Sequence, residues 1–225
     1  MIRPRLLLRA LLAVGVLMLA GCATQPGYDY SAFRESRPRS ILVLPPLNDS
    51  PDVNATYSMY AQTTLPLAES GYYVLPVTLV DEAFRQNGLT APADIQQVPL
   101  KKLREIFGAD AALYIKVTHY GTKYMIISSE TRVSAEGKLV DLRSGATLWE
   151  GRATASSAEG DNNSGGGALG LLLKAVITQI ADTLSNRGHP IAGITASRLL
   201  SAGRPNGILY GPRSPKYQKD GSPAP

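Results

Sequence analysis

The chain has 225 residues with a hydrophobic fraction of 44%, enough for one folded domain of about 150 residues plus terminal segments. Its formal net charge of +5 at pH 7 is largely N-terminal. Arg3, Arg5 and Arg9 precede position 22 and no acid does, so the rest of the chain keeps 20 basic and 18 acidic residues, a net of +2. This weak charge, with no basic segment interleaved with aromatics, argues against a nucleic-acid-binding protein.

The N-terminus has the layout of an export signal. Leu6 to Ala20 form a mainly apolar run after the first arginines, and Leu19-Ala20-Gly21-Cys22 resembles the lipobox at which prolipoproteins are cut and acylated. The apolar part, Leu11 to Ala20, is shorter than the roughly 20 residues that a membrane-spanning helix needs. We therefore predict a signal peptide at 1–21 and lipidation of Cys22, the only cysteine, which has no partner for an internal disulfide.

The residues after Cys22 predict where the lipid holds the protein. Residue 23 is Ala rather than Asp, which by resemblance to enterobacterial sorting signals favours the outer membrane over the inner one. Residues 22–39 contain Pro26, Gly27 and Pro38 and show no apolar periodicity, so we predict a tether between lipid and domain. The predicted location is the periplasmic face of the outer membrane, with display on the cell surface as the alternative.

Between residues 40 and 108, short strands alternate with helices. The apolar run at 41–44, closed by Pro45-Pro46, predicts a buried strand, and 72–75 predicts a second. Capping residues and terminal glycines predict helices at 54–64, 78–87 and 99–107.

The segment from 111 to 158 changes to strands. Residues 111–117 predict a central strand, and Met125–Val140 alternates apolar and polar residues as a half-buried strand does. A three-residue loop, Arg143-Ser144-Gly145, then gives a long antiparallel hairpin at about 125–158. This loop predicts the pairs Lys138–Glu150, Glu136–Arg152, Leu139–Trp149, Gly137–Gly151 and Leu142–Ala146. Opposite charges meet on one face, and Leu, Trp and small residues share the other.

The C-terminal part predicts helices and a tail. Leucine and isoleucine recur every three or four residues over 169–184, which predicts an amphipathic helix on one face of the sheet, and 191–200 predicts a short helix. From Gly203 onward nine of 23 residues are Gly or Pro, so 201–225 is expected to be an extended or disordered tail. The predicted fold is α/β (α+β), a layered sandwich with a mixed β-sheet, in one domain at 40–200.

The sequence carries no convincing catalytic, metal or cofactor motif. Its two histidines, His119 and His189, lie 70 residues apart and neither sits at a metal-ligand spacing. Ser164 lacks the Gly-x-Ser-x-Gly frame of an exposed nucleophile, and Gly165-Gly166-Gly167 lacks the Gly-Lys of a phosphate loop. We therefore expect a protein that is not an enzyme and has no cofactor.

Tyrosines and the charged hairpin face are the candidate interaction residues. There are eleven tyrosines against three Phe and one Trp, and tyrosine is enriched in protein interfaces, although several are also expected in the core or at sheet edges. The charged strand face is likewise open either to solvent or to a partner protein. The candidate surface comprises Tyr57, Tyr60, Tyr72, Tyr73, Tyr124, Glu130, Arg132, Glu136, Lys138, Glu150 and Arg152.

Four segments together resemble a family of bacterial lipoproteins of unassigned function that includes a neisserial surface-antigen candidate found by genome mining. These segments are Ile41-Leu42-Val43-Leu44-Pro45-Pro46-Leu47-Asn48, residues 66–77, Gly108-Ala109-Asp110-Ala111 with the strand that follows, and Leu148-Trp149-Glu150-Gly151. More distantly they look like the TolB N-terminal domain and curli secretion lipoprotein superfamily. The resemblance implies an α/β domain with a mixed sheet and an assembly role in the periplasm, and it supplies no catalytic residues.

Three functional hypotheses follow. The leading one is a non-enzymatic, membrane-anchored periplasmic module that binds other envelope proteins in an export or transport assembly. The second is a homo-oligomeric structural or channel component related to the curli secretion lipoprotein, against which the charged hairpin face argues, since a lipid-facing strand would be apolar. The third, a periplasmic hydrolase, requires a cleft with perturbed acids or histidines, which the sequence does not indicate.

Overall fold

A mixed β-sheet organises the chain. The computed structural model describes residues 28–124, 129–160 and 187–220, and within them six strands form one sheet in the order β3-β1-β4-β5-β6, with β2 paired to β4. The strands are β1 (Ser40–Val43), β2 (Leu47–Asn48), β3 (Tyr73–Val74), β4 (Ala111–Tyr124), β5 (Ser129–Asp141) and β6 (Thr147–Ser156). β1 runs parallel to β3 and β4, whereas β4, β5 and β6 are antiparallel. The predicted mixed α/β fold is confirmed.

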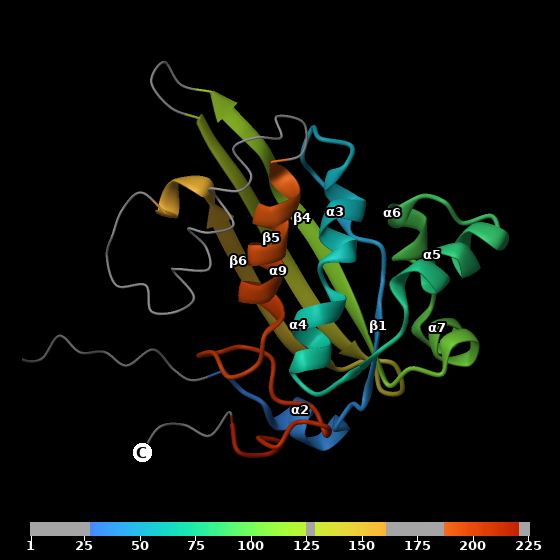
Figure 1. Cartoon of the computed structure of the whole chain (residues 1–225). Helices are drawn as coiled ribbons and strands as arrows, with labels where there is room; N and C mark the ends of the chain where they lie inside the picture. The colour runs from blue at the N-terminus through green and yellow to red at the C-terminus, as the bar shows by residue number, and fades with distance from the viewer. Residues whose placement is uncertain (1–27, 125–128, 161–186, 221–225) are drawn as a thin grey trace, which may run out of the picture.

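Helices cover the sheet unevenly (Figure 1). On one face lie α3 (Ala55–Ala61), α4 (Thr64–Glu69) and α9 (Gly188–Leu200); beside β1, on the other face, lie α5 (Val77–Gln86), α6 (Pro92–Ile95) and α7 (Leu100–Phe107). α2 (Ser31–Ser36) lies at one end, and η2 (Ser157–Gly160) follows β6. The helix predicted at 54–64 divides into α3 and α4, and the helix predicted at 169–184 lies outside the described residues.

The hairpin of β5 and β6 has the predicted register but not the predicted turn. Lys138 faces Glu150, Glu136 faces Arg152, Leu139 faces Trp149 and Gly137 faces Gly151. The predicted pairing of Leu142 with Ala146 is wrong. The backbone N–H of Leu142 instead donates to the Asp110 backbone oxygen at 2.9 Å, and the Leu142 side chain is buried. The turn is therefore wider than predicted. A bulge between the pairs Leu139–Trp149 and Val140–Thr147 connects this turn to the predicted register.

Segments beyond both predicted domain boundaries pack on the core. Tyr30 and Phe33, placed in the tether by sequence, are buried, and so are Ile208 and Leu209 of the predicted tail. Residues 203–220 are therefore part of the folded domain. Gly71 allows the C-terminal segment to approach this closely. It has φ +97°, and a Cβ there would lie 2.8 Å from the Gly211 backbone oxygen, too close for any other residue.

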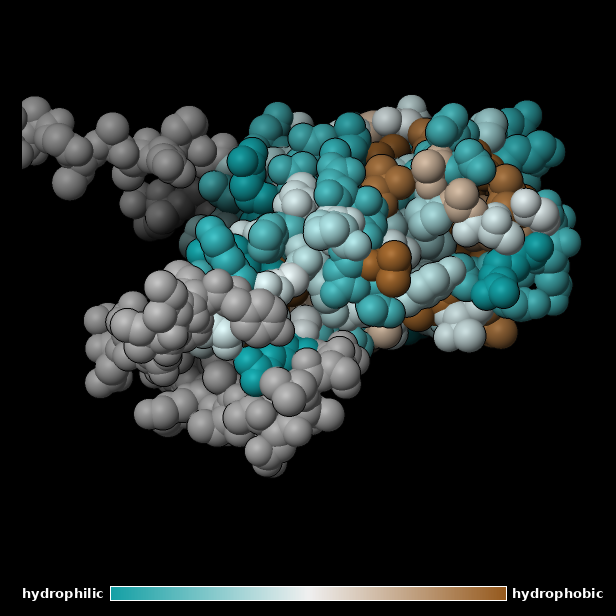
Figure 2. Space-filling view, turned by 90° about the horizontal axis from the view of Figure 1, so that it is seen from above, coloured by the Kyte–Doolittle hydropathy of each residue, from teal (hydrophilic) through white to brown (hydrophobic). Residues whose placement is uncertain are grey.

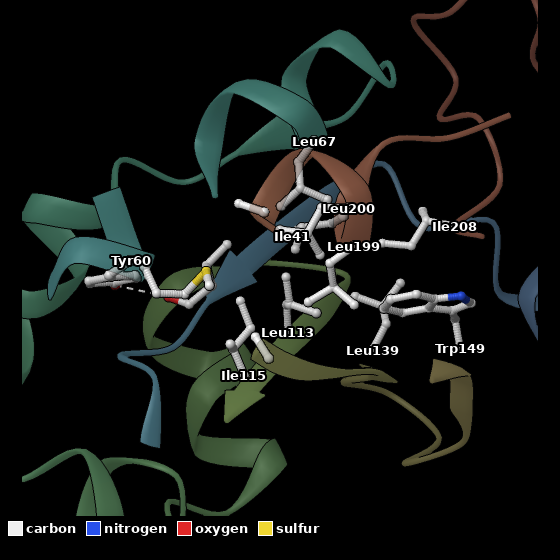
Figure 3. Close-up of a cluster of buried hydrophobic side chains, with 14 of the residues drawn as sticks. Ile41, Tyr60, Leu67, Leu113, Ile115, Leu139, Trp149, Leu199, Leu200 and Ile208 are labelled. Atoms are coloured by element: carbon white, nitrogen blue, oxygen red, sulfur yellow. Dashed lines mark hydrogen bonds between the residues drawn. The ribbon is translucent and has the colours of Figure 1, made fainter. Parts of the chain in front are cut away.

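The main core cluster lies between the sheet and α3, α4 and α9. Leu199 of α9 points toward the hairpin residues Leu139 and Trp149, and Ile208 lies near the indole (Figure 3). The indole lies over the cross-strand glycine pair, since a Cβ on Gly151 would be 2.2 Å from a ring carbon of Trp149. Two glycines thus make room for the largest side chain of the core.

A second core cluster covers only part of the opposite face. Leu42 of β1, Leu44 directly after it and Ala112 of β4 belong to this cluster. They pack with Phe84 of α5 and Leu103 of α7. β5 and β6 extend beyond these helices. The same face of the sheet is therefore covered near β1 and open over the hairpin.

Candidate functional site

The hairpin has one dry and one wet face. Along β5, burial alternates strictly from residue 131 to 139, with the odd-numbered residues buried and Arg132, Glu136 and Lys138 exposed. On β6, Glu150 and Arg152 are exposed as well. We call the surface formed by Arg132, Glu136, Lys138, Glu150 and Arg152 the open face.

The charges of the open face continue onto β4 in rows across the strands. Lys116 of β4 is in register with Glu136, which faces Arg152, and Tyr114 is in register with Lys138, which faces Glu150. The Lys138 Nζ lies 3.1 Å from the Glu150 Oε1, and the Lys116 Nζ lies 2.6 Å from the Asp49 Oδ2. The hydrogen bond from Lys116 and the charge of Asp49 raise the pKa of Lys116, which keeps this lysine protonated.

A groove of about 520 Å³ lies on the open face beside α6. Its lining includes Tyr28, Gln96, Tyr114, Lys116, Glu136, Lys138, Glu150 and Arg152. Gln96 fixes the α6 side by donating its amide to the Pro45 oxygen at 2.9 Å and the Ile115 oxygen at 3.2 Å. Tyr28 fixes the β6 side, because its hydroxyl oxygen accepts the Glu150 N–H at 3.0 Å. Sequence reasoning missed Tyr28, Gln96 and Lys116, since tertiary packing alone brings them to the hairpin.

Glu130 lies at the far end of the same face and is less exposed. It accepts hydrogen bonds from the Ser156 hydroxyl at 2.6 Å and from Arg132 at 2.7 Å. The Ser156 bond, and then the Arg132 bond, lower the pKa of Glu130. Glu130 and Arg132 are therefore partly neutralised by each other.

The predicted tyrosines divide into two groups. Tyr57 and Tyr73 are 51% and 47% exposed, on α3 and β3 rather than on the open face. The prediction that Tyr60 and Tyr72 lie at the surface is wrong, because both side chains are buried. The Tyr60 hydroxyl donates to the Val43 backbone oxygen at 3.0 Å, and the Tyr72 hydroxyl donates to the Leu209 backbone oxygen at 2.6 Å. Burial raises the pKa of both. The side chain of Tyr124 lies outside the described part.

A serine and a histidine far apart in sequence meet between α3 and α9. The Ser58 Oγ lies 2.9 Å from the His189 Nδ1, and the His189 Nε2 lies 2.8 Å from the Gln62 Nε2. Ser58 also accepts the Tyr120 hydroxyl at 2.9 Å and is only 8% exposed. A nucleophile and base would need an accessible serine and an orienting acid; here an amide takes the place of the acid. We interpret this group as a polar link between α3, α9 and β4.

Residues 28–124, 129–160 and 187–220 contain no group of three His, Cys, Asp or Glu side chains that could hold a metal ion. In the same residues, no helix is long and apolar enough to cross a membrane. Seen from above, the hydrophobic residues at the surface form small separate patches among hydrophilic ones (Figure 2). The open face with its groove brings together five of the sequence-predicted charged residues, Arg132, Glu136, Lys138, Glu150 and Arg152.

Residues 28–213 match the family described as "Putative lipoprotein GNA1162-like". The chain belongs to this family. A relative, "Putative lipoprotein NMB1124/NMB1162" of Neisseria meningitidis serogroup B, is 54% identical over 200 residues, which cover 88% of this chain and 92% of the relative. The crystal structure of lipoprotein GNA1162 from Neisseria meningitidis is 56% identical, with a TM-score of 0.53, and covers 65% of this chain and 100% of that one. The resemblance to the neisserial lipoprotein family is confirmed.

More distant solved structures also match part of the chain. The PelC L103M dodecamer from Paraburkholderia phytofirmans is 17% identical, covering 70% of this chain and 92% of that one with a TM-score of 0.40. The LpoB C-terminal domain from Salmonella enterica is also 17% identical, covering 62% and 90% with a TM-score of 0.38. A likeness this distant says nothing about function.

Proposed function

We propose that this GNA1162-like lipoprotein is a non-enzymatic binding module of the cell envelope. The chain is exported, cut before Cys22 and acylated there, and the lipid holds the domain at the periplasmic face of the outer membrane. The open face then binds another envelope protein. Family membership and the lipobox at Leu19-Ala20-Gly21-Cys22 support the anchor.

The open face is the observation that carries the binding role. Its side chains are exposed, carry both signs of charge and are held in rows by the strand register. The Lys138–Glu150 pair has side chains that are 49% and 57% exposed, and exposed pairs contribute about 0–1 kcal/mol to folding. The fold therefore does not depend on these charges, whereas a fixed pattern of charges gives a complementary protein surface its specificity and register.

The groove supports the same role because it makes the open face concave, so that a side chain of a partner protein can be inserted. Strand residues form its floor, and Gln96 and Tyr28 form its sides. A partner side chain seated there would be desolvated among Tyr114, Lys138 and Arg152, as in interface centres, where aromatic residues and arginine are enriched.

Site-specific photocrosslinking in cells tests the binding role. A photoreactive residue replaces Lys138 on the open face, and in the control strain it replaces Glu82, which is exposed on α5. We expect the same crosslinked envelope protein in repeated experiments from position 138 and not from position 82. Equal or absent crosslinking at the two positions would contradict the proposal. Crosslinks from position 138 only to a second copy would replace it with the homo-oligomeric hypothesis.

Metabolic labelling tests the anchor separately. The wild-type chain is expected to incorporate radiolabelled palmitate and to fractionate with outer membranes. The Cys22→Ser chain is expected to lose the label, because no other cysteine exists to accept the lipid. Labelling of the serine variant, or recovery of unlabelled wild-type protein in the soluble fraction, would overturn the anchor.

A further inference from the structure

The positive charge of the domain is concentrated at one end. Residues 28–40 and 203–220 together hold seven Lys or Arg and three acids, a net charge of +4. Residues 22–225 as a whole carry +2, so residues 41–202 carry −2. Two segments at opposite ends of the sequence thus hold the entire positive excess.

These two segments lie side by side at the end of the sheet where α2 is found (Figure 1). The Tyr30 hydroxyl donates to the Gly207 oxygen, and the backbone N–H of Tyr28 donates to Asn206 at 3.2 Å. A third contact runs through β3, because Tyr73 donates its backbone N–H to the Arg39 oxygen and its ring lies 5.3 Å from the Arg213 guanidinium. We call this surface the basic pole.

Six of the seven cations of the basic pole are exposed, and Arg204 is half-buried. Arg37, Arg39, Arg213, Lys216 and Lys219 are all exposed, and among the described residues none of the five forms an ion pair with an acid. Arg213 and Lys216 lie over tyrosine rings, which hold their side chains in place without neutralising them. On the open face, by contrast, lysines and arginines alternate with glutamates.

The basic pole also contains an aromatic cleft. A cavity of about 280 Å³ between α2 and the 203–220 segment is lined by the apolar and aromatic residues Phe33, Tyr72, Leu209, Tyr210 and Tyr217. Two cations, Arg34 and Arg37, and one acid, Asp220, also line it. Tyrosine favours the headgroup region of a bilayer, where the ring is in an apolar layer and the hydroxyl reaches water. Cations surrounding tyrosines are the composition expected of a surface that contacts phospholipid head groups.

The length of the chain before the described fold places this pole near the membrane. Cys22 is six residues before Tyr28, and six residues span at most about 20 Å when fully extended. The chain enters the fold at Tyr28, which contacts the tail at the basic pole. Attraction to anionic lipids extends over about one Debye length, roughly 8–10 Å at physiological salt. The short tether allows the pole to come within this distance of the membrane.

We propose that the basic pole docks on anionic phospholipid head groups and forms, with the acylated Cys22, the second membrane contact of the protein. This inference rests on the anchor proposed above. The lipid fixes the chain at a single point, Cys22, and a basic surface beside a lipid anchor adds a second attachment to the membrane. Docking through this pole also orients the domain, so that the hairpin extends away from the bilayer and the open face stays accessible to a partner.

Vesicle co-sedimentation tests the proposal without the lipid anchor. The protein used is the mature chain from residue 22 with Cys22→Ser, which contains every described residue. We expect binding to vesicles with about 30% phosphatidylglycerol, little binding to pure phosphatidylcholine, and loss of binding as salt is raised well above roughly 0.1 M. Equal binding to the two vesicles, or none to either, would overturn the proposal, and absence of binding would leave the pole for an acidic protein partner.

Matched variants locate the contact. Arg39→Gln, Arg213→Gln and Lys216→Gln together should lower vesicle affinity roughly 100-fold, at about fivefold per cation near an anionic surface. The control removes three exposed cations of α5 and α7 with Arg85→Gln, Lys101→Gln and Lys102→Gln, and should change affinity less than about fivefold. Equal losses in both variants would show attraction to net charge alone and contradict a docking pole, provided that circular dichroism shows both variants folded.

The two tests fail independently. The vesicle result does not depend on acylation, because the protein lacks Cys22. Absence of the palmitate label from the wild-type chain would overturn the anchor while leaving the vesicle binding unchanged. Absence of vesicle binding would overturn the docking pole while leaving the anchor unchanged.

Discussion

The two faces of the β5–β6 hairpin are built from the same strands but satisfy different physical requirements. On the inner face, Leu139 and Trp149 are at most 1% exposed and pack against Leu199 of α9. On the outer face, Lys138 and Glu150, each one residue away, are about half exposed and form an ion pair. Burial of Trp and Leu stabilises the fold by several kcal/mol, whereas the exposed pair contributes little.

This comparison separates the residues that fold the protein from those free to bind. The inner face tolerates few changes because its packing is close, down to the glycine pair beneath the indole. The outer face keeps a defined charge pattern that its own stability does not require. Substitutions on the two faces should therefore separate stability from binding.

Removing the indole should have the largest effect on stability. Trp149 is 1% exposed and its Nε1 donates to the Asn206 oxygen at 3.0 Å, so it ties the hairpin to the C-terminal segment. Trp149→Ala should lower the free energy of unfolding by about 3–5 kcal/mol. Urea unfolding followed by circular dichroism measures this value, and a loss below about 1 kcal/mol would show that the inner face is not the main core.

Adding a methyl group under the indole should lower the free energy of unfolding somewhat less than removing the indole. A Cβ on Gly151 would lie 2.2 Å from a Trp149 ring carbon, whereas one on Gly137 would lie 3.2 Å from the ring. Gly151→Ala should lower the free energy of unfolding by about 3 kcal/mol, at the upper end of overpacking effects, and Gly137→Ala by about 1 kcal/mol. The same urea experiment compares them, and the reverse order would mean that the indole does not lie over the glycine pair.

Asp141, at the turn between β5 and β6, should make the free energy of unfolding depend on pH. Asp141 is 1% exposed. Burial alone would raise its pKa, but hydrogen bonds from Ser36, Ser144 and Arg143 outweigh it and lower the pKa from 3.8 to about 2. Because the folded-state pKa is depressed, this stabilisation is complete only above about pH 5 and is lost as the pH falls through 3.8 toward 2.

The shift corresponds to about 2 kcal/mol. Asp141→Asn should remove that stability at pH 7 and flatten the pH dependence between about pH 4 and pH 2. Unfolding curves at several pH values measure both effects, with the exposed Asp94→Asn as control. An unchanged slope below pH 4 in Asp141→Asn would assign the acid sensitivity to other groups.

On the outer face, breaking an ion pair should change stability least. Lys138→Gln removes the 3.1 Å contact with Glu150, and the free energy of unfolding should fall by less than about 0.5 kcal/mol. Urea unfolding at low and high salt measures it, and the variant and wild type should converge as salt screens the pair. A loss above about 2 kcal/mol would mean that these charges serve the fold.

The sequence predicts those parts of the fold that depend on local patterns. The period-two alternation and the charge pairs predicted the hairpin register, and Gly108, with φ +65°, ends α7 as predicted. The Gly- and Pro-rich composition of 203–220 did not predict its packing, because Ile208 and Leu209 are recognisable as core only once Trp149 and Tyr72 are in place.

The candidate site was predictable only in part, for the same reason. The strand alternation predicted that four charged residues lie on one face of the hairpin: Glu136, Lys138, Glu150 and Arg152. Tyr60 and Tyr57 lie three residues apart on α3, and only the packing of that helix on β1 decides that the first is buried and the second exposed. Gln96 reaches the groove through hydrogen bonds to Pro45 and Ile115, contacts that no local pattern reveals.

One variant of the open face tests whether its charges serve binding and not folding, because stability and partner capture are both measured in it. Glu136→Gln, Lys138→Gln and Arg152→Gln are combined, with a photoreactive residue at the exposed Thr154 as probe, and the charge-matched control combines Glu82→Gln, Arg85→Gln and Lys102→Gln. The open-face variant should lose partner crosslinks at least roughly tenfold, an effect of about 1.4 kcal/mol. Its free energy of unfolding should stay within about 1 kcal/mol of wild type. Undiminished crosslinking in a folded open-face variant, or an equal loss in the control, would contradict a binding role for these charges.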